Sequence, residues 1–263
     1  MIIAALLTVN AIVTALCFVA LWLISLRLKD VSFIDAWWAL GLVVIAGVSF
    51  MNSKPGSPHA ILLASLCAIW GLRLGGYLLW RWRQHGPDRR YVKILARSQA
   101  QGWSFAAASF LFVFALQAPL QFIVSLPVQL GQLSPHLELG PLAWAGAALA
   151  ATGILFESIG DWQLTAFRAS PANKGKVLDT GLWRYTRHPN YFGDACVWWG
   201  LWLIAADAGF GAWTLPGPVL ITYLLTSLSG VPTVEGHLKR SRPDYEAYVA
   251  RTSGFIPLPP KRG

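Results

Sequence analysis

Seven long apolar stretches constrain the fold of this chain more than any other feature of its sequence. Each holds about 20 mostly apolar residues, the length that an α-helix needs to cross the hydrocarbon core of a bilayer. Charged residues make up only 13% of the chain, about half of what a soluble domain carries. We therefore predict an all-α, polytopic membrane protein with seven transmembrane helices. The predicted spans are Ile2–Leu26, Phe33–Met51, Ala60–Trp80, Trp103–Val128, Pro141–Phe167, Pro189–Ala206 and Ala212–Val231.

The positions of the basic residues predict the orientation of these spans. All of the 21 lysines and arginines except Lys54 and Arg73 follow the first, third, fifth or seventh span. Basic loops stay on the cytoplasmic side of a membrane, so we expect the N-terminus outside and the C-terminus in the cytoplasm. This topology and attraction to anionic membrane lipids account for the net charge of +9. Nucleic acid is therefore not an expected partner.

Several classes of site are excluded by missing motifs. The three cysteines lie in apolar runs and the five histidines are widely scattered, so we expect neither a disulfide framework nor a metal site. The chain lacks the glycine-rich motifs of Rossmann and P-loop nucleotide sites. It also lacks the Gly-x-Ser-x-Gly turn that carries a serine nucleophile.

Ionisable residues inside the predicted spans are candidates for function, because such groups are costly at membrane depth. Asp35 lies in the second span, while Arg73 and Tyr77 share one face of the third. Asp161 and Asp194 lie in the fifth and sixth spans. Two interpretations of Asp35 are open: a structural ion pair with Arg73, or a catalytic acid that acts with Tyr77.

The densest polar cluster covers residues 180–194, before and at the start of the sixth span. Arg187 and His188 precede the span, where cations can bind a phosphate or a carboxylate. Asn190 and Asp194 are one helical turn apart, and an amide beside a carboxylate suits a ribose or a carboxamide. A basic and aromatic belt at the membrane interface would explain the cations but not the two polar residues inside the span.

These residues resemble a known family. Residues Gly181–Asp194 look like the C-terminal signature of steroid 5-alpha-reductases and related sterol reductases, and Glu235–Pro257 is similar to the closing segment of that family. Ahead of Glu157, the segments Phe33–Trp38, Trp70–Gly75 and Pro87–Tyr91 resemble an uncharacterised bacterial branch of the same superfamily.

The resemblance implies a single membrane domain, residues 1–263. Residues 1–128 would form the substrate side, and residues 141–263 a reductase-like half with the cofactor site. Its implied activity is hydride transfer from NADPH to a C=C bond of an enone-type steroid or other lipid-like substrate, in a bacterial inner membrane. The cofactor residues that it implies are Asp161, Arg168, Arg187, His188, Asn190, Tyr191, Asp194, Tyr245, Tyr248 and Arg251. The family's acid on span two and tyrosine on span three point to Asp35 and, two turns past the aligned position, to Tyr77 as catalytic residues.

Two other functions remain open. A membrane methyltransferase of the isoprenylcysteine type would share the Arg-His-Pro-x-Tyr-x-Gly run and would bind S-adenosylmethionine. Asn190, and Asp194 directly after Gly193, favour the reductase. A non-catalytic lipid-binding membrane protein would bind neither cofactor. The sequence carries no signal for an oligomeric state.

Overall fold

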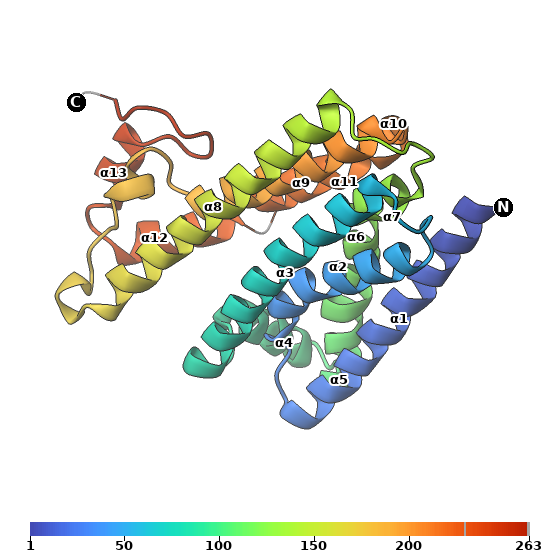
Figure 1. Cartoon of the computed structure of the whole chain (residues 1–263). Helices are drawn as coiled ribbons and strands as arrows, with labels where there is room; N and C mark the ends of the chain where they lie inside the picture. Colours follow the sequence, from blue (N-terminus) through green and yellow to red (C-terminus); the bar gives the residue numbers. More distant parts are fainter. Residues whose placement is uncertain (229, 262–263) are drawn as a thin grey trace. The chain divides into compact units, whose positions relative to one another are not determined.

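The computed structural model describes residues 1–228 and 230–261. The secondary structure of these residues consists of helices, and no β-strand is assigned among them (Figure 1). The all-α prediction is therefore confirmed. The chain divides into two compact units, each described separately below. Unit 1 holds Met1–Trp144 and Leu201–Gly217, and unit 2 holds Ala145–Gly200 and Pro218–Gly263. The expected substrate side, residues 1–128, and cofactor half, residues 141–263, stay a prediction.

Five helical segments among the described residues are long and apolar enough to cross a membrane. They are α1 (Ile2–Leu28), α2 (Ile34–Met51), α3 (Pro58–His85), the segment Phe105–Val124, and α8 (Pro141–Ala169). These segments match the first five predicted spans. The protein is an integral membrane protein on this evidence.

Local signals set the ends of α3, which extends beyond the predicted Ala60–Trp80. The Ser57 Oγ accepts a hydrogen bond from the Ala60 N–H at 3.3 Å, and Pro58 occupies the first turn, where its missing N–H costs no bond. The helix ends at Gly86, whose φ of 71° is easily adopted only by glycine.

The fourth predicted span is one helical segment with an internal change of hydrogen bonding. It comprises α5 (Phe105–Ser109), the π turn Phe110–Phe114 and α6 (Ala115–Val124), followed by α7 (Leu126–Leu130). Pro119 lies within α6 and lacks an N–H for the helix ladder. The wider turn precedes this proline by about one helical turn.

The region of the last two predicted spans is helical but is not among the five apolar segments. Here α9 (Pro189–Asp207) is a single helix, followed by α10 (Gly211–Thr214), α11 (Pro216–Tyr223) and the π turn Leu224–Leu228. Membrane crossing by these residues stays a prediction. Three further helices lie in the polar segments: α4 (Arg89–Ala100), α12 (Val231–Ser241) and α13 (Tyr245–Arg251).

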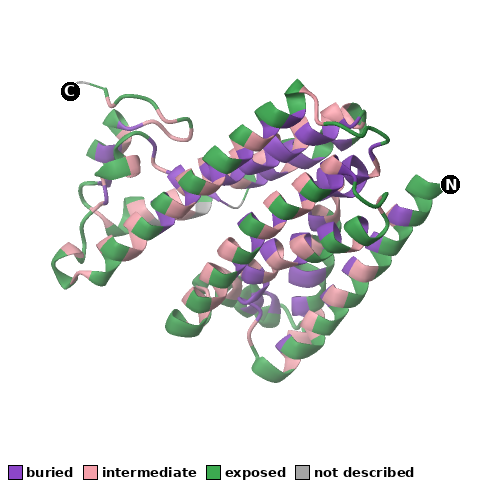
Figure 2. Cartoon of the chain, viewed as in Figure 1, coloured by how far each residue is buried: buried purple, intermediate pink, exposed green. Residues whose placement is uncertain are grey.

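The buried positions of α1 are more polar than those of a helix in a soluble protein. Three of the five are Asn10, Thr14 and Ser25, beside Leu6 and Phe18, whereas Ile12 and Leu16 are exposed. Figure 2 shows α1 largely exposed along its length. A helix that turns its aliphatic side chains outward and its polar side chains inward is suited to a lipid environment, since lipid cannot satisfy polar groups.

The polar side chains buried in unit 1 bind one another. The Asn10 Nδ2 donates to the Ser49 Oγ at 2.9 Å and to the Gln129 Oε1 at 3.0 Å. Gln129 in turn donates to the Ser125 Oγ at 2.7 Å. These bonds join α1, α2 and α7 by polar contacts, a means of helix association that operates inside a bilayer.

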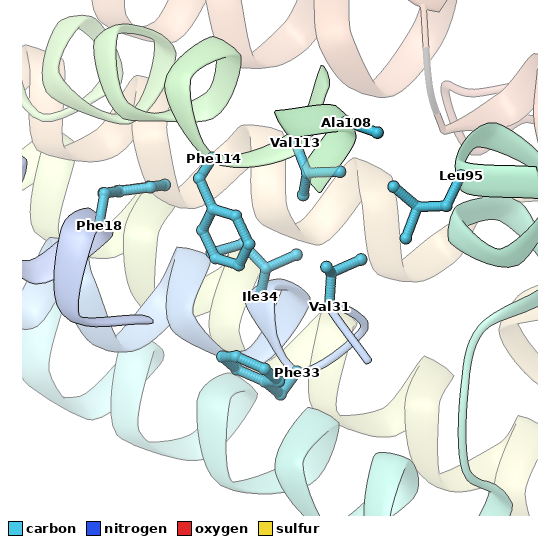
Figure 3. Close-up of a cluster of buried hydrophobic side chains, with 8 residues drawn as sticks. All are labelled: Phe18, Val31, Phe33, Ile34, Leu95, Ala108, Val113 and Phe114. Atoms are coloured by element: carbon cyan, nitrogen blue, oxygen red, sulfur yellow. The ribbon is translucent and has the colours of Figure 1, made fainter. Parts of the chain in front are cut away.

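Apolar packing in unit 1 surrounds the start of α2. Figure 3 shows Ile34 and Phe33 beside Phe114, with Val31 and Val113 close by. Small residues bring α2 and α3 together: a Cβ added at Gly71 would lie 2.4 Å from the Val43 Cγ2. Gly71 and Gly75, four residues apart on α3, therefore let α2 approach α3 closely.

Unit 2 uses the same packing principle between α8 and α9. A Cβ on Gly193 would lie 2.6 Å from the Gly153 carbonyl oxygen, and one on Gly153 would lie 2.5 Å from the Gly193 oxygen. The two backbones therefore touch at these glycines, which brings the acidic residues of α8 beside the first turns of α9.

Candidate functional site

A partly buried carboxylate, Glu235 on α12, joins Arg187 and His188, the two residues that precede α9. The Arg187 Nε donates to the Glu235 Oε1 at 2.8 Å, and the His188 Nε2 lies 3.1 Å from the same oxygen. The side chain of Glu235 is 14% exposed. Burial alone would raise the pKa of Glu235, but the hydrogen bonds from His188 and Arg187 outweigh it and lower the pKa to about 2.

Arg187 also fixes the C-terminal tail. Its Nη1 donates to the Thr252 carbonyl at 2.7 Å, and its backbone N–H donates to the Ser253 carbonyl at 2.9 Å. Thr186 adds a bond from its Oγ1 to the Phe255 carbonyl at 2.8 Å. The N–H groups of Arg187 are therefore largely bound to groups of this chain. Anchoring of the C-terminal tail was not the role predicted for Arg187, which was cofactor binding.

The two predicted tail tyrosines are buried on α13. The Tyr248 hydroxyl donates to the Trp183 carbonyl at 2.5 Å, which anchors α13 to the segment before α9. Burial and, next, the nearby Glu235 carboxylate raise the pKa of Tyr245 to about 12. Burial and then Tyr245 raise the pKa of Tyr248 as well. Both phenols are therefore protonated at neutral pH.

The predicted amide and carboxylate residues lie on α8 and α9. The Asn190 Nδ2 donates to the Asp161 Oδ1 at 3.3 Å, so the structure brings these two candidates together. His188 stacks on Tyr191 with ring centroids 5.3 Å apart and planes 3° apart. Asp194 is buried in α9, and Arg168 lies in the last turn of α8.

The catalytic candidate Asp35 lies in the first turn of α2, where a carboxylate is favoured by the helix dipole. Its Oδ1 accepts a hydrogen bond from the Tyr91 hydroxyl at 2.7 Å, and its Oδ2 is bound by the Arg90 Nη2. Both partners come from α4, a helix that lies outside the predicted spans. Its N-terminal signal was Asp88, whose carboxylate accepts the Arg90 N–H at 2.8 Å.

The charges around Asp35 shift the pKa values of both α4 residues. Burial acts to lower the pKa of Arg90, but the Asp35 and Asp88 carboxylates outweigh it and raise the pKa. Burial and then the Asp35 carboxylate raise the pKa of Tyr91 well above its ordinary value. The Gln117 Nε2 lies 3.4 Å from the Tyr91 oxygen. This arrangement holds a neutral phenol against an ionic pair.

The Asp35 network continues into the loop before α2. The Arg90 Nε donates to Asp88, the Asp88 N–H donates to the Ser32 Oγ, and the Ser32 Oγ donates to the Asp30 Oδ1 at 2.7 Å. The Trp82 indole donates to the other Asp30 oxygen at 2.7 Å. The network thus joins the ends of three helices, α1, α2 and α3, to α4.

Tyr77, the second catalytic candidate, lies on α3. Its ring stacks on Trp80 with centroids 6.1 Å apart, and the Arg81 guanidinium lies 6.0 Å from its centroid. Its pairing with Asp35 stays a prediction. Sequence reasoning missed Tyr91 and Arg90 as the partners of Asp35, and Glu235 as the partner of Arg187 and His188. Tyr91 and Glu235 belong to the segments that carried the family resemblance, but the pairing itself had no local signal.

Comparison with known proteins places the chain among proteins of unknown function. The profile of the family described as "Protein of unknown function (DUF1295)" matches residues 21–252. An uncharacterised protein of Schizosaccharomyces pombe is 22% identical over 218 residues, which cover 72% of this chain and 61% of the relative. The match thus spans less than two thirds of that relative's length. No solved structure matches the chain.

Proposed function

This chain belongs to the DUF1295 family of proteins of unknown function, and for its activity we propose NADPH-dependent reduction of a C=C bond in a lipid-like enone, such as a steroid. The proposal includes the seven-span topology with an outside N-terminus and a cytoplasmic C-terminus, in a bacterial inner membrane. It follows the resemblance to steroid 5-alpha-reductases. The observation that carries it is the hydrogen bond between Tyr91 and Asp35.

Reduction of an enone requires a hydroxyl or acid near the carbonyl oxygen of the substrate, and the Tyr91 and Asp35 pair contains a hydroxyl. Addition of a hydride to the β carbon of an enone places negative charge on the carbonyl oxygen, and a proton must then reach the α carbon. A hydroxyl aimed at that oxygen stabilises the charge and can supply the proton. Methyl transfer to a thiolate or a carboxylate requires no proton donor, so an acid–phenol pair favours the reductase over the methyltransferase.

To act as such a donor, Tyr91 must turn its one O–H proton from the Asp35 Oδ1 to the substrate oxygen, and water would then return a proton to the phenolate. The raised pKa of Tyr91 keeps the hydroxyl protonated at neutral pH. The residue also lines a pocket of about 220 Å³ in unit 1, together with Val31, Leu95 and Phe105. The wall is mostly apolar but also carries Lys29, Asp30 and Gln99. Its apolar part beside the phenol suits the ring of a lipid-like substrate. In this proposal Tyr91 takes the role that the resemblance assigned to Tyr77.

The residues of unit 2 fit parts of NADPH unequally. The Asn190 and Asp161 pair presents amide donors and carboxylate acceptors, which fits a ribose or a nicotinamide carboxamide. Arg187 fits a phosphate poorly, because Glu235 and Thr252 already engage its donors. Arg168 and Arg251 are the remaining predicted arginines for the phosphates, and Arg251 is itself paired with Asp179. Bound NADPH would supply the hydride, while Asp35 and Tyr91 would handle the proton.

The test begins with cofactor binding to the purified protein in detergent. NADPH, NADH and S-adenosylmethionine are compared by thermal shift, since a ligand at 100 times its Kd stabilises by about 2.7 kcal/mol. We expect stabilisation by NADPH and its loss in Asn190→Ala. Stabilisation by S-adenosylmethionine alone would support the methyltransferase instead.

The second step measures NADPH oxidation with a panel of enone lipids. Tyr91→Phe should keep NADPH binding and lose at least about 100-fold in turnover, the contribution typical of a general acid. Tyr77→Phe and the exposed Tyr185→Phe are matched controls that should retain turnover. Full turnover in both Tyr91→Phe and Tyr77→Phe would remove the donor role from both tyrosines. Loss of turnover in Tyr77→Phe alone would return the donor role to Tyr77.

A further inference from the structure

An open pocket of about 720 Å³ lies in unit 2, apart from the Glu235 cluster and the Asn190–Asp161 pair. Its walls come from the segment before α9, the end of α13 and the C-terminal tail. They carry three cations, two hydroxyls and one carboxylate: Arg184, Arg251, Lys261, Thr180, Thr252 and Asp179.

The charges in this pocket are unbalanced. The Asp179 Oδ2 accepts a hydrogen bond from the Arg251 Nη2 at 2.5 Å, so the one carboxylate among the described residues of the wall is already paired. No described side chain pairs with Arg184 or Lys261. Two exposed cations therefore face a cavity that also offers two hydroxyl donors.

The backbone on both sides of Arg184 is fixed before any ligand arrives. The Trp183 carbonyl accepts the Tyr248 hydroxyl at 2.5 Å, and the Tyr185 carbonyl accepts the Leu258 N–H at 3.0 Å.

Lys261 is placed in a similar way. Its N–H donates to the Arg251 carbonyl at 2.9 Å, which brings the tail against the end of α13. A site whose walls are already ordered loses less entropy when it binds.

We propose that this pocket binds a phosphate group, supplied by an anionic lipid headgroup or by a soluble phosphorylated molecule. Arginine can bind phosphate oxygens with two parallel N–H donors, lysine adds a point charge, and the threonine hydroxyls can donate further bonds. The pocket shares Arg251 with the proposed cofactor site. Its test uses no cofactor and varies Arg184 and Lys261, which the reductase proposal does not use, so failure of one proposal can be told from failure of the other.

The test uses the full chain in lipid nanodiscs and has two arms. In the first, calorimetry measures inorganic pyrophosphate binding to protein in phosphatidylcholine nanodiscs. In the second, native mass spectrometry compares retention of phosphatidylglycerol and phosphatidylcholine. Binding of pyrophosphate supports a soluble source, and selective retention of phosphatidylglycerol without pyrophosphate binding supports a lipid headgroup.

Two double variants distinguish phosphate binding in the pocket from nonspecific electrostatic attraction to the basic protein. Arg184→Gln with Lys261→Gln should weaken the observed binding at least about tenfold, as expected for the loss of two charge-assisted contacts. Lys174→Gln with Lys239→Gln removes the same charge from exposed residues outside the pocket and should change it little. Equal loss in both double variants, or no binding in either arm, overturns the proposal.

A third variant keeps the test informative if the double variant folds poorly. Asp179→Asn removes the carboxylate that the described part of the chain contributes to the wall, and it frees the Arg251 guanidinium. It should tighten phosphate binding, and weaker or unchanged binding in a folded Asp179→Asn protein would count against the site.

Discussion

Removal of the charge on Glu235 should destabilise unit 2 in a manner that depends on pH. The Glu235 carboxylate holds Arg187 and His188 together, and its pKa lies at about 2 against an ordinary value of 4.5. A difference of one pKa unit corresponds to 1.36 kcal/mol, so the difference is worth about 3 kcal/mol before screening. Partial solvent contact reduces this to roughly 2 kcal/mol.

The sign follows from the lowered pKa. Because the folded protein binds this proton less readily than the unfolded chain, the stabilisation is complete above pH 4.5 and declines as the pH falls toward 2. At pH 7, Glu235→Gln should therefore unfold more easily than the wild type by about 2 kcal/mol. Near pH 2 most of the difference should disappear.

Thermal unfolding in detergent at a series of pH values measures this difference. Glu246→Gln is the matched control, because Glu246 is an exposed residue of the neighbouring helix α13 and has no described ion pair. The control should follow the wild type at every pH. A deficit in Glu235→Gln that is the same at pH 3 and pH 7 would show that the charge of Glu235 does not stabilise the cluster.

Three further outcomes test the packing and the membrane placement. Gly71→Ala should lose about 1–3 kcal/mol in thermal unfolding, because its Cβ would press on Val43, whereas Gly76→Ala, with open space around it, should be as stable as the wild type or more so. Arg187→Ala should release the tail from the Thr252 carbonyl, and limited trypsin digestion should then cleave the tail faster than in the wild type. Leu16→Lys should reduce membrane insertion of α1 by about 3 kcal/mol in a glycosylation-mapping assay, since Leu16 is exposed on this apolar helix.

Much of the fold was predictable because a span is a local property. A stretch of about 20 apolar residues is sufficient by itself for a membrane helix, whatever its neighbours are. The first five spans could therefore be located, with ends shifted by signals such as the Ser57 cap and Gly86. The approach of α2 to the Gly71 and Gly75 pair was likewise visible as a spacing of small residues.

The pairings in the candidate site were less accessible. Asp35 could be recognised as unusual, but its partners Arg90 and Tyr91 come 55 and 56 residues later, on a helix outside the predicted spans. Amphipathic α4 has a buried face of only Leu95 and Ser98, so its apolar signal was weak. Glu235 meets Arg187 and His188 across 48 and 47 residues, and no spacing rule covers such distances.

The sequence by itself determined that this protein lies in a membrane, that it is helical, and where five of its helices can cross the bilayer. These are properties of single segments, because the hydropathy of a segment does not depend on its neighbours. Only the tertiary structure decided which polar groups meet. Asn10 faces Gln129, Asp35 faces Tyr91, and Glu235 faces Arg187, because separate helices bring these groups within hydrogen-bonding distance. Buried polar groups must find partners inside the protein, and which partner each one finds depends on packing between elements distant in the chain.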